Sequence, residues 1–276
     1  MRRSARPDTG RYPYLDNAAG SPPRPQPIAL SHRGFASDGG ENTLAAFERA
    51  VALGFRYLEI DVRASSDGVV MVFHDDVLDR VTGDRGPVAE RTAQELGRLS
   101  VGGGGGIPTL EAVLLRWPEV RLNIDVKSDA CVRPFADLIN RHAAHDRVLV
   151  ASFSDRRRRA VLRLLDRPTA SSAGMTVNVL LKIAAPLGLA GPVARTARVH
   201  ALQVPETYRG VRVVTRGFVR RCEDAGLQVH VWTVNERAGM DRLLDLGVHG
   251  IVSDAADVLA ECMGERAVWP QGRPAD

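Results

Sequence analysis

Two acidic residues stand two positions apart in the apolar stretch "FRYLEIDV", and a third lies in the similar stretch "LNIDVK". Because alternate residues of a β-strand point to the same face, Glu59 and Asp61 would point the same way. Asn123, Asp125 and Lys127 would share a face for the same reason. Buried carboxylates that converge repel one another and become protonated unless positive charge lies between them. A hard divalent cation would resolve this conflict, so the pattern predicts a Mg²⁺ or Ca²⁺ site formed by Glu59, Asp61 and Asp125.

Two histidines and two basic residues accompany these acids at the ends of strand-like runs. His32 and Arg33 follow "IALS", His74 ends "VVMVFH", and Lys127 ends "NIDVK". Histidine is the usual proton-transfer group near neutral pH, which predicts an acid–base pair. Arg33 would bind a phosphate through its fork of donors and Lys127 as a point charge. An isolated pair of acids would more simply form salt bridges with arginines, but this combination favours cleavage of a phosphodiester.

The elements that would hold these residues are strand-like and helix-like runs that alternate from Ile28, where ordered structure is expected to begin. Such alternation with short connections is typical of a parallel sheet covered by helices. About eight strand positions remain when the "VVMVFH" hairpin is set aside, and a TIM barrel has roughly 250 residues. We therefore predict an α/β fold, a TIM (β/α)8 barrel, whose C-terminal face collects these residues with Trp232, Asn235 and Asp254. A doubly wound open sheet is the alternative, but no Gly-x-Gly-x-x-Gly follows the first strand.

The chain is expected to consist of one barrel between two tails. Residues 1–27 include four prolines in "SPPRPQP" and are predicted to form a Pro-rich tail. The barrel would span 28–265, with a small insertion after the second strand at about 63–107. Residues 266–276 would form a C-terminal tail.

Two stretches are harder to interpret. Five consecutive glycines, Gly102–Gly106, have no side chains to pack and are expected to form a mobile loop. The apolar segment 177–194 is broken by Pro186 and Pro192, so it would form either a barrel helix with a long loop or an exposed apolar lid.

Composition limits the compartment and the partners. No apolar run approaches the roughly 18–20 residues that span a bilayer, and none follows Arg2 and Arg3, so neither stable membrane insertion nor a secretory signal is expected. Three scattered cysteines predict reduced thiols in a cytoplasmic protein. A net charge of +4 favours anionic partners. The cluster Arg156–Arg159 is interpreted as a solvated helix start, and only 5% of the residues are aromatic, which argues against nucleic-acid binding.

These motifs together resemble the glycerophosphodiester phosphodiesterase family. The similarity runs in order through "HRG", "ENTLAAFERAVALGFRYLEIDV", "SSDGVVMVFHDDVLDRVTGDRG", "IPTLEAVL", "LNIDVK", "VHVWTVN" and "GIVSD". It covers roughly residues 28–262 and implies a TIM barrel with a small insertion that carries His74. It also implies an enzyme, a phosphoric diester hydrolase that splits small glycerophosphodiesters into an alcohol and glycerol 3-phosphate.

Matched motif by motif, His32 and His74 resemble the general acid and base of the family. Glu59 and Asp61 resemble its metal ligands. Asp125 stands where the family usually has glutamate. Its carboxylate is one methylene shorter, so the metal would have to lie closer or bind through a water. The related sphingomyelinase D-like barrels have aspartate there.

The resemblance also implies how the substrate is held and attacked. Arg33 and Lys127 would contact the phosphate, and Trp232 would form a wall of the substrate pocket. Glu41 corresponds to the acid of the family's "PEN" motif, with Gly40 in place of the proline, and would orient the site or reach the metal. The implied mechanism is attack by the substrate's own neighbouring hydroxyl, giving a cyclic phosphate that water then opens. A positioned intramolecular hydroxyl has a large entropic advantage over free water.

Two other functions remain open. Hydrolysis of lysophospholipids by a lysophospholipase D-type enzyme on the same barrel would be favoured if 177–194 formed an exposed lip for a lipid chain. A buried segment would favour a water-soluble diester, which is the preferred substrate. A barrel that binds phosphoesters without catalysis would need a broken site, whereas both histidines and all three carboxylates are present.

Overall fold

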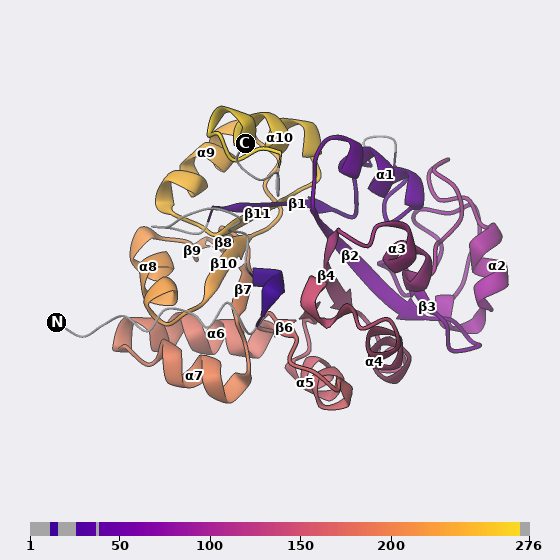
Figure 1. Ribbon diagram of the computed structural model, residues 1–276, viewed down its shortest axis with the longest axis horizontal. Coiled ribbons are helices and arrows are strands. Elements are labelled where there is room, and N and C mark those ends of the chain that lie inside the picture. The colour runs from indigo at the N-terminus through magenta and orange to yellow at the C-terminus, as the bar shows by residue number, and fades with distance from the viewer. Residues whose placement is uncertain (1–11, 16–25, 37–38, 271–276) are drawn as a thin grey trace.

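The structure is a computed structural model that describes residues 12–15, 26–36 and 39–270. Eight parallel strands follow one another around a barrel in the order β6-β5-β4-β2-β1-β11-β10-β7, with helices on the outside (Figure 1). This architecture confirms the predicted TIM-type barrel. The barrel strands are β1 (Ile28–His32), β2 (Tyr57–Ala64), β4 (Arg121–Val126), β5 (Val148–Ala151), β6 (Ala170–Ser171), β7 (Ala201–Val204), β10 (Gln228–Val231) and β11 (Gly250–Ser253). Three further strands lie outside this order: β3 (Val70–Val72), β8 (Thr207–Tyr208) and β9 (Val211–Arg212).

Helices connect most of the strands. In the described part of the chain the α-helices are α1 (Leu44–Ala52), α2 (Ala93–Arg98), α3 (Leu110–Arg116), α4 (Val132–Arg141), α5 (Asp155–Leu164), α6 (Met175–Ala184), α7 (Ala190–Ala197), α8 (Arg216–Asp224), α9 (Arg237–Leu246) and α10 (Ala256–Glu265). Short 3-10 helices occur at η2 (Pro13–Leu15), η3 (Val88–Glu90), η4 (Ala144–Arg147) and η5 (Ala185–Leu187). Thr43 caps α1, because its side-chain oxygen accepts a hydrogen bond from the backbone N–H of Ala46 at 3.2 Å.

Alternation along β2 explains how one strand serves both the core and the barrel interior. Leu58, Ile60 and Val62 are buried in the main hydrophobic core, which lies between the strands and the helices. Tyr57 belongs to a second, smaller core inside the barrel. Because side chains alternate in a strand, residues on the Tyr57 side, Glu59 among them, point into the barrel above that core.

The barrel closes between the strands β6 and β7. A parallel bridge joins Ser172 to Ala201, and the N–H of Ala173 donates to the carbonyl of Ala201 at 2.9 Å. Arg158 of α5 is fully buried beside this junction and donates to the Ser171 hydroxyl at 3.0 Å and to the Ala197 carbonyl at 2.9 Å. The prediction of a solvated arginine cluster is therefore wrong for Arg158, whose fork satisfies carbonyls at the seam.

Ordered structure begins before Ile28, contrary to the prediction. Tyr14 and Leu15 of η2 are buried in the inner core, and η2 lies over the middle of the barrel in Figure 1. The Tyr57 hydroxyl donates to the Tyr14 carbonyl at 3.2 Å, and the Gln228 amide donates to the Leu15 carbonyl at 2.9 Å. Positions 1–11 and 16–25 of the predicted tail lie outside the described residues.

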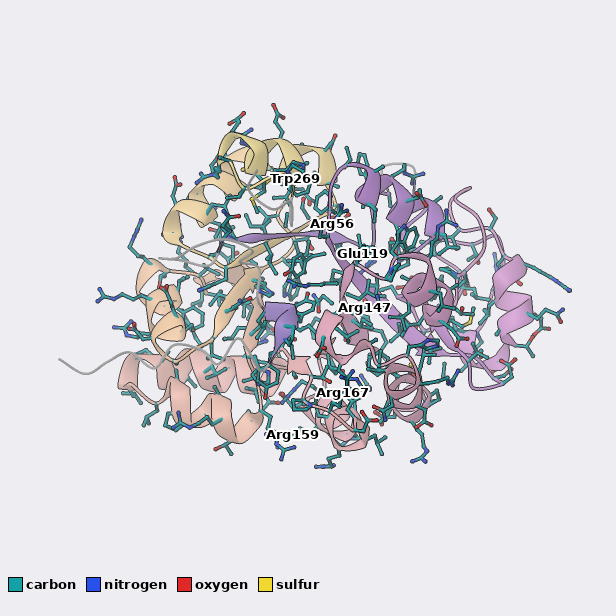
Figure 2. The ribbon with its side chains drawn as sticks, viewed as in Figure 1. Arg56, Glu119, Arg147, Arg159, Arg167 and Trp269 are labelled. Atoms are coloured by element: carbon teal, nitrogen blue, oxygen red, sulfur yellow. The ribbon has the colours of Figure 1, made fainter. Side chains whose placement is uncertain are left out.

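The predicted C-terminal tail also contacts the barrel over its first residues. The indole N–H of Trp269 donates to the Leu53 carbonyl at 3.1 Å, and its ring packs edge-on against Phe55 with centroids 4.7 Å apart. Trp269 is labelled in Figure 2, beside the C-terminal helices. Positions 271–276 lie outside the described residues.

The insertion after β2 forms a small unit with its own core. β3 pairs antiparallel with β2, which confirms the predicted hairpin, and Met71, Phe73 and Leu96 are among the buried residues of this core. The five glycines are not a free loop. A Cβ on Gly102 would lie 2.3 Å from the carbonyl oxygen of Gly39, and one on Gly106 would lie 2.0 Å from that of Gly97. Only glycine allows backbone to pack so closely against backbone here.

The segment 177–194 contains more regular structure than a barrel helix with a long loop or an exposed lid would have. It is divided among α6, η5 and α7, and much of its apolar surface is exposed. Within the described ranges, no helix is long and apolar enough to cross a membrane.

Candidate active site

The strand register brings the predicted residues together at the C-terminal ends of neighbouring strands. His32 of β1 pairs with Glu59 of β2, and Glu59 pairs with Asn123 of β4. One level higher, Asp61 pairs with Asp125. These side chains line a cavity of about 180 Å³ together with Arg33, His74, Lys127, Phe153, Gln203, Trp232, Thr233 and Val252. The structure therefore places every predicted catalytic, metal and phosphate-binding side chain in one cavity, and Glu41 just behind it.

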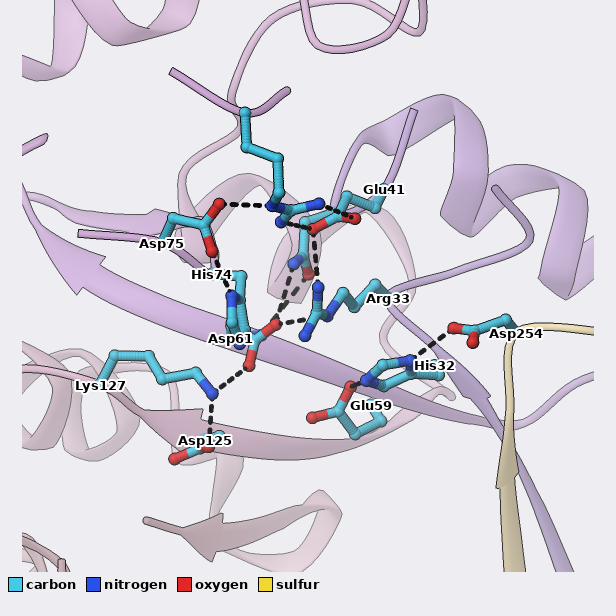
Figure 3. Close-up of polar contacts among 12 residues, drawn as sticks. His32, Arg33, Glu41, Glu59, Asp61, His74, Asp75, Asp125, Lys127 and Asp254 are labelled. Carbon is cyan, nitrogen blue, oxygen red and sulfur yellow. Dashed lines mark hydrogen bonds and ion pairs between the residues drawn. The ribbon is translucent and has the colours of Figure 1, made fainter. Parts of the chain in front are cut away.

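Each histidine is held by an aspartate at Nδ1 (Figure 3). Nδ1 of His32 lies 2.5 Å from Oδ1 of Asp254, and Nδ1 of His74 lies 2.5 Å from Oδ1 of Asp75. A carboxylate at this nitrogen keeps a proton there, so the other nitrogen, Nε2, carries the variable proton. The Nε2 atom of His32 lies 3.6 Å from Oε2 of Glu59. Both rings are thus oriented by a carboxylate at Nδ1.

The two aspartates are themselves anchored. Asp254 accepts a hydrogen bond from the Asn235 amide at 2.9 Å, and Asp75 accepts one from Nε of Arg80 at 2.6 Å. Although burial alone would lower it, Glu59 and Asp254 raise the pKa of His32 above its ordinary value. Burial alone would raise the pKa of Asp254, but hydrogen bonds from His32 and Asn235 and the charge of His32 lower it, which keeps this aspartate ionised.

Asp61 is the centre of a network of positive charge. It forms ion pairs with Lys127 at 2.9 Å and with Nε of Arg33 at 3.0 Å, and the Asn42 amide donates to it at 3.1 Å. Burial would raise the pKa of Asp61, but Lys127 and Arg33 hold it below its ordinary value. Lys127 also donates to Asp125 at 2.7 Å. Lys127 therefore supplies part of the positive charge that the sequence assigned to a cation.

Three oxygen atoms near this network are buried and have no hydrogen-bond partner. They are Oε2 of Glu59, Oδ1 of Asn123 and Oδ1 of Asp125. Burial, and then the charge of Asp61, raise the pKa of Glu59 to about 7. Buried polar atoms are nearly always satisfied, so three unsatisfied oxygens on neighbouring strands need a partner such as an ion. Carboxylate and amide oxygens are ligands of hard divalent cations, so this donor set fits such an ion.

These open oxygens overlap only in part with the predicted ligands Glu59, Asp61 and Asp125. Among the described residues, no three His, Cys, Asp or Glu side chains form a ready-made metal-binding group. The oxygens left open belong to Glu59, Asp125 and the amide of Asn123, whereas Asp61 already has its partners. Asn123 was placed on this face from the sequence but given no role.

Glu41 links two arginines of the site, Arg33 and Arg80. It accepts hydrogen bonds from Arg33 at 2.8 Å and from Arg80 at 2.6 Å and 3.0 Å. Burial alone would raise the pKa of Glu41, but these two arginines lower it. Because Arg80 also holds Asp75, a chain of contacts runs from Arg33 through Glu41 and Arg80 to His74. This agrees with the expected orienting role of Glu41.

A second, largely apolar chamber of about 440 Å³ lies alongside the polar cavity. The two share Asp125, Phe153, Gln203 and Trp232 as wall residues. The Trp232 ring packs against that of Phe153, with centroids 5.9 Å apart. Trp232 is therefore a wall of the cavity, as predicted, and it separates a polar space from an apolar one.

Several residues of the site escaped the sequence reasoning. Asn42 was given no role in the site from the sequence, yet its amide donates a hydrogen bond to Asp61. Asn235 and Asp254 were noted at strand ends without a role. Asp75 directly follows His74, and its position was the available signal. Arg80 had no signal, because it reaches Asp75 and Glu41 only through the fold of the insertion.

The sequence is also similar to known proteins of one family. Residues 32–258 match the model of the Glycerophosphoryl diester phosphodiesterase family. Over 244 residues the chain is 43% identical to a Mycobacterium tuberculosis protein named "Probable glycerophosphodiester phosphodiesterase 2", with 88% of this chain and 92% of that protein covered.

Two solved structures share the fold. A glycerophosphodiester phosphodiesterase of Agrobacterium tumefaciens superimposes with a TM-score of 0.71 at 24% identity, covering 86% of this chain and 100% of that one. A phosphodiesterase of Oleispira antarctica, in complex with the product sn-glycerol-3-phosphate, superimposes with a TM-score of 0.72 at 22% identity, covering 87% and 97%. At these identities the two structures support the fold alone.

Proposed function

Because the chain belongs to the glycerophosphoryl diester phosphodiesterase family, we propose that the polar cavity is its active site and that His32 and His74 carry out acid–base catalysis there. The chain is a glycerophosphodiester phosphodiesterase, which hydrolyses small glycerophosphodiesters. The observation that carries the residue assignment is the pair of aspartate-held histidines in one cavity with Arg33 and Lys127. Two proton-transfer groups and two cations are what cleavage of an anionic diester requires.

Arg33 and Lys127 would bind the phosphate. Both line the cavity, and both are held by carboxylates, Arg33 by Glu41 and Asp61 and Lys127 by Asp61 and Asp125. Such anchoring fixes the positive charge before the substrate arrives, so little reorganisation is needed during reaction. After the alcohol has left and water has opened the cyclic phosphate, glycerol 3-phosphate would remain on these two side chains.

The hydroxyl next to the phosphate-bearing carbon would be the first nucleophile. One histidine takes the proton of this hydroxyl through Nε2 as its oxygen bonds to phosphorus. The other histidine gives its Nε2 proton to the departing alcohol oxygen as that phosphorus–oxygen bond breaks. Water then opens the cyclic phosphate, with the two histidines in exchanged roles, and glycerol 3-phosphate results.

A divalent cation, Mg²⁺ or Ca²⁺, would be held by Glu59 and Asp125, with the amide oxygen of Asn123 as the third protein ligand. The support is the open oxygens of Glu59, Asn123 and Asp125. When bound, the cation would neutralise charge that develops on the phosphate oxygens. Lys127 meanwhile keeps Asp61 and Asp125 from repelling each other.

The mechanism is tested with a diester that lacks the neighbouring hydroxyl. Choline release from propane-1,3-diol phosphocholine should be slower than from glycerophosphocholine by about 10³-fold or more, because free water replaces a positioned hydroxyl. The analogue should still compete for the site, since its phosphate is unchanged. Comparable turnover of both compounds would show that water attacks phosphorus directly and that no cyclic phosphate forms.

Asp254 and Asp75 are expected to be positioning residues. Replacing either with asparagine should lower kcat for glycerophosphocholine by about 10- to 100-fold, because the ring it holds loses its fixed tautomer. KM should change little, since neither aspartate lies among the cavity-lining residues. Asp137→Asn, an exposed change on α4, is the matched control. A rise in KM with unchanged kcat in the Asp254→Asn and Asp75→Asn variants would show that these aspartates serve substrate binding instead.

A lysophospholipid is the second candidate substrate, favoured by the apolar chamber. From the sequence alone both substrates remained open, with the water-soluble diester as the preferred one. The chamber, however, adjoins the catalytic cavity, and its wall includes exposed Val179 and Ile183. An acyl chain could lie there while the phosphate occupies the polar side. A higher kcat/KM for lysophosphatidylcholine than for glycerophosphocholine, reduced by Ile183→Asp, would establish this substrate. Hydrolysis of glycerophosphocholine without any hydrolysis of lysophosphatidylcholine would exclude the lysophospholipid as a substrate.

A further inference from the structure

Exposed apolar side chains are concentrated on one part of this protein. Of the twelve large hydrophobic residues that are exposed among the described residues, eight lie between positions 175 and 211. We call this group the apolar lip. It consists of Met175, Val179, Leu180, Ile183, Leu187, Leu189, Tyr208 and Val211. Concentrated apolar surface of this kind marks an interaction site.

α6 is the main element of the lip, and it is apolar on two opposite faces. Val177, Leu181 and Ala184 are buried against the body of the protein. On the other side, Ile183 is 61% exposed and Leu187, in η5, is 69% exposed. Apolar side chains on both sides of a helix are normally buried, so the outward side of α6 lacks a partner within the part of the chain that the structure describes. In Figure 1, α6 and α7 form an edge of the molecule, and no other element lies outside them.

The charges around the lip are basic. The sequence has no aspartate or glutamate from position 167 to position 205, whereas Lys182 lies within α6 itself. In the β8–β9 hairpin, exposed Arg209 and Arg212 alternate with exposed Tyr208 and Val211. The acid of this region, Glu206, is paired with Arg242 of α9 at 2.6 Å. Tyrosine and arginine beside apolar side chains form the mixture that suits a membrane–water interface.

Part of the lip also lines the apolar chamber. Val179, Ile183, Tyr208 and Val211 belong both to the lip and to the chamber wall, which continues to Trp232 at the catalytic cavity. A surface that settled on the lip would therefore lie beside the chamber that adjoins the active site.

We propose that the apolar lip is a docking surface for anionic phospholipid membranes. Leu180, Ile183 and Leu187 enter the boundary between head groups and acyl chains, and Arg209 and Arg212 contact the lipid phosphates. A second copy of the chain fits this surface less well, because two copies would bring basic lips face to face in a protein of net charge +4. Docked in this way, the lip would rest on the membrane surface. Docking does not depend on the catalytic assignment.

Co-sedimentation of the full chain with lipid vesicles tests this proposal. The wild-type protein should bind vesicles of equal parts phosphatidylglycerol and phosphatidylcholine, bind pure phosphatidylcholine more weakly, and be released as salt is raised. Leu187→Glu and Leu180→Glu should each weaken the partition coefficient by about tenfold. The matched control is Leu115→Glu on α3, because Leu115 is 64% exposed and lies outside the lip. It should leave binding unchanged.

Three outcomes would overturn the proposal. They are no binding of the wild type to anionic vesicles, an equal loss in Leu115→Glu, or a concentration-dependent dimer that disappears in Leu187→Glu without any vesicle binding. The last would make the lip a contact between copies. Hydrolysis of glycerophosphocholine without vesicles should be the same in wild type and Leu187→Glu, since Leu187 does not line either cavity. This assay separates failure of docking from failure of the catalytic proposal.

Discussion

Replacing His32 or His74 with glutamine is expected to lower kcat for glycerophosphocholine by about 10²- to 10⁴-fold each. Glutamine is close to histidine in size and can still donate to Asp254 or Asp75, but it cannot take up or release a proton. Steady-state choline release measures the effect. In each step one histidine takes up a proton while the other releases one, so neither can replace the other.

The fold should survive both changes. His32 and His74 are partly exposed at the cavity, and neither belongs to a hydrophobic core. Far-UV circular dichroism and the melting temperature should therefore stay close to wild type. His142→Gln is the matched control, since His142 also faces a carboxylate, Glu111 at 2.7 Å, away from the cavity. Wild-type turnover in either His32→Gln or His74→Gln would contradict the acid–base assignment.

Removing a proposed cation ligand is the change with the second largest expected effect. Glu59→Gln and Asp125→Asn should each weaken Mg²⁺ or Ca²⁺ binding by at least about tenfold, because each takes a charged oxygen from the site. Titration calorimetry on protein stripped with EDTA measures this affinity without substrate. Turnover should fall in parallel and recover partly at high cation concentration.

The controls separate ligation from general loss of charge. Asp137→Asn removes an exposed carboxylate on α4 and should leave cation affinity unchanged. Asn123→Leu should weaken cation binding if the amide oxygen is a ligand. If Glu59→Gln and Asp125→Asn bind the cation as tightly as wild type, the open oxygens of this cavity serve some other purpose.

The residues that were predicted correctly are those whose position follows from strand periodicity. Glu59 and Asp61 share a face because side chains alternate every two residues, and the parallel register then sets them beside Asn123 and Asp125. His32 follows from the same rule, because it ends β1 and pairs with Glu59. Because neighbouring parallel strands of a barrel end at the same face, the local pattern of each strand was enough to predict that these residues converge.

The contacts that were missed join distant segments of the chain. Arg80 and Asp254 act through side chains that only the folded insertion and the last strand bring near His74 and His32. Lys127 was predicted to face phosphate, and its place between Asp61 and Asp125 needed the register of two strands. Periodicity also does not show what covers a helix, so the exposed face of α6 appears only in the structure.

Product analysis with glycerophosphocholine is the most direct test of the proposed reaction, using the chain stripped with EDTA and then restored with Mg²⁺ or Ca²⁺. Choline and glycerol 3-phosphate should form in equal amounts, and only after a cation is restored. Undiminished turnover in EDTA, or phosphocholine and glycerol as the products, would contradict it.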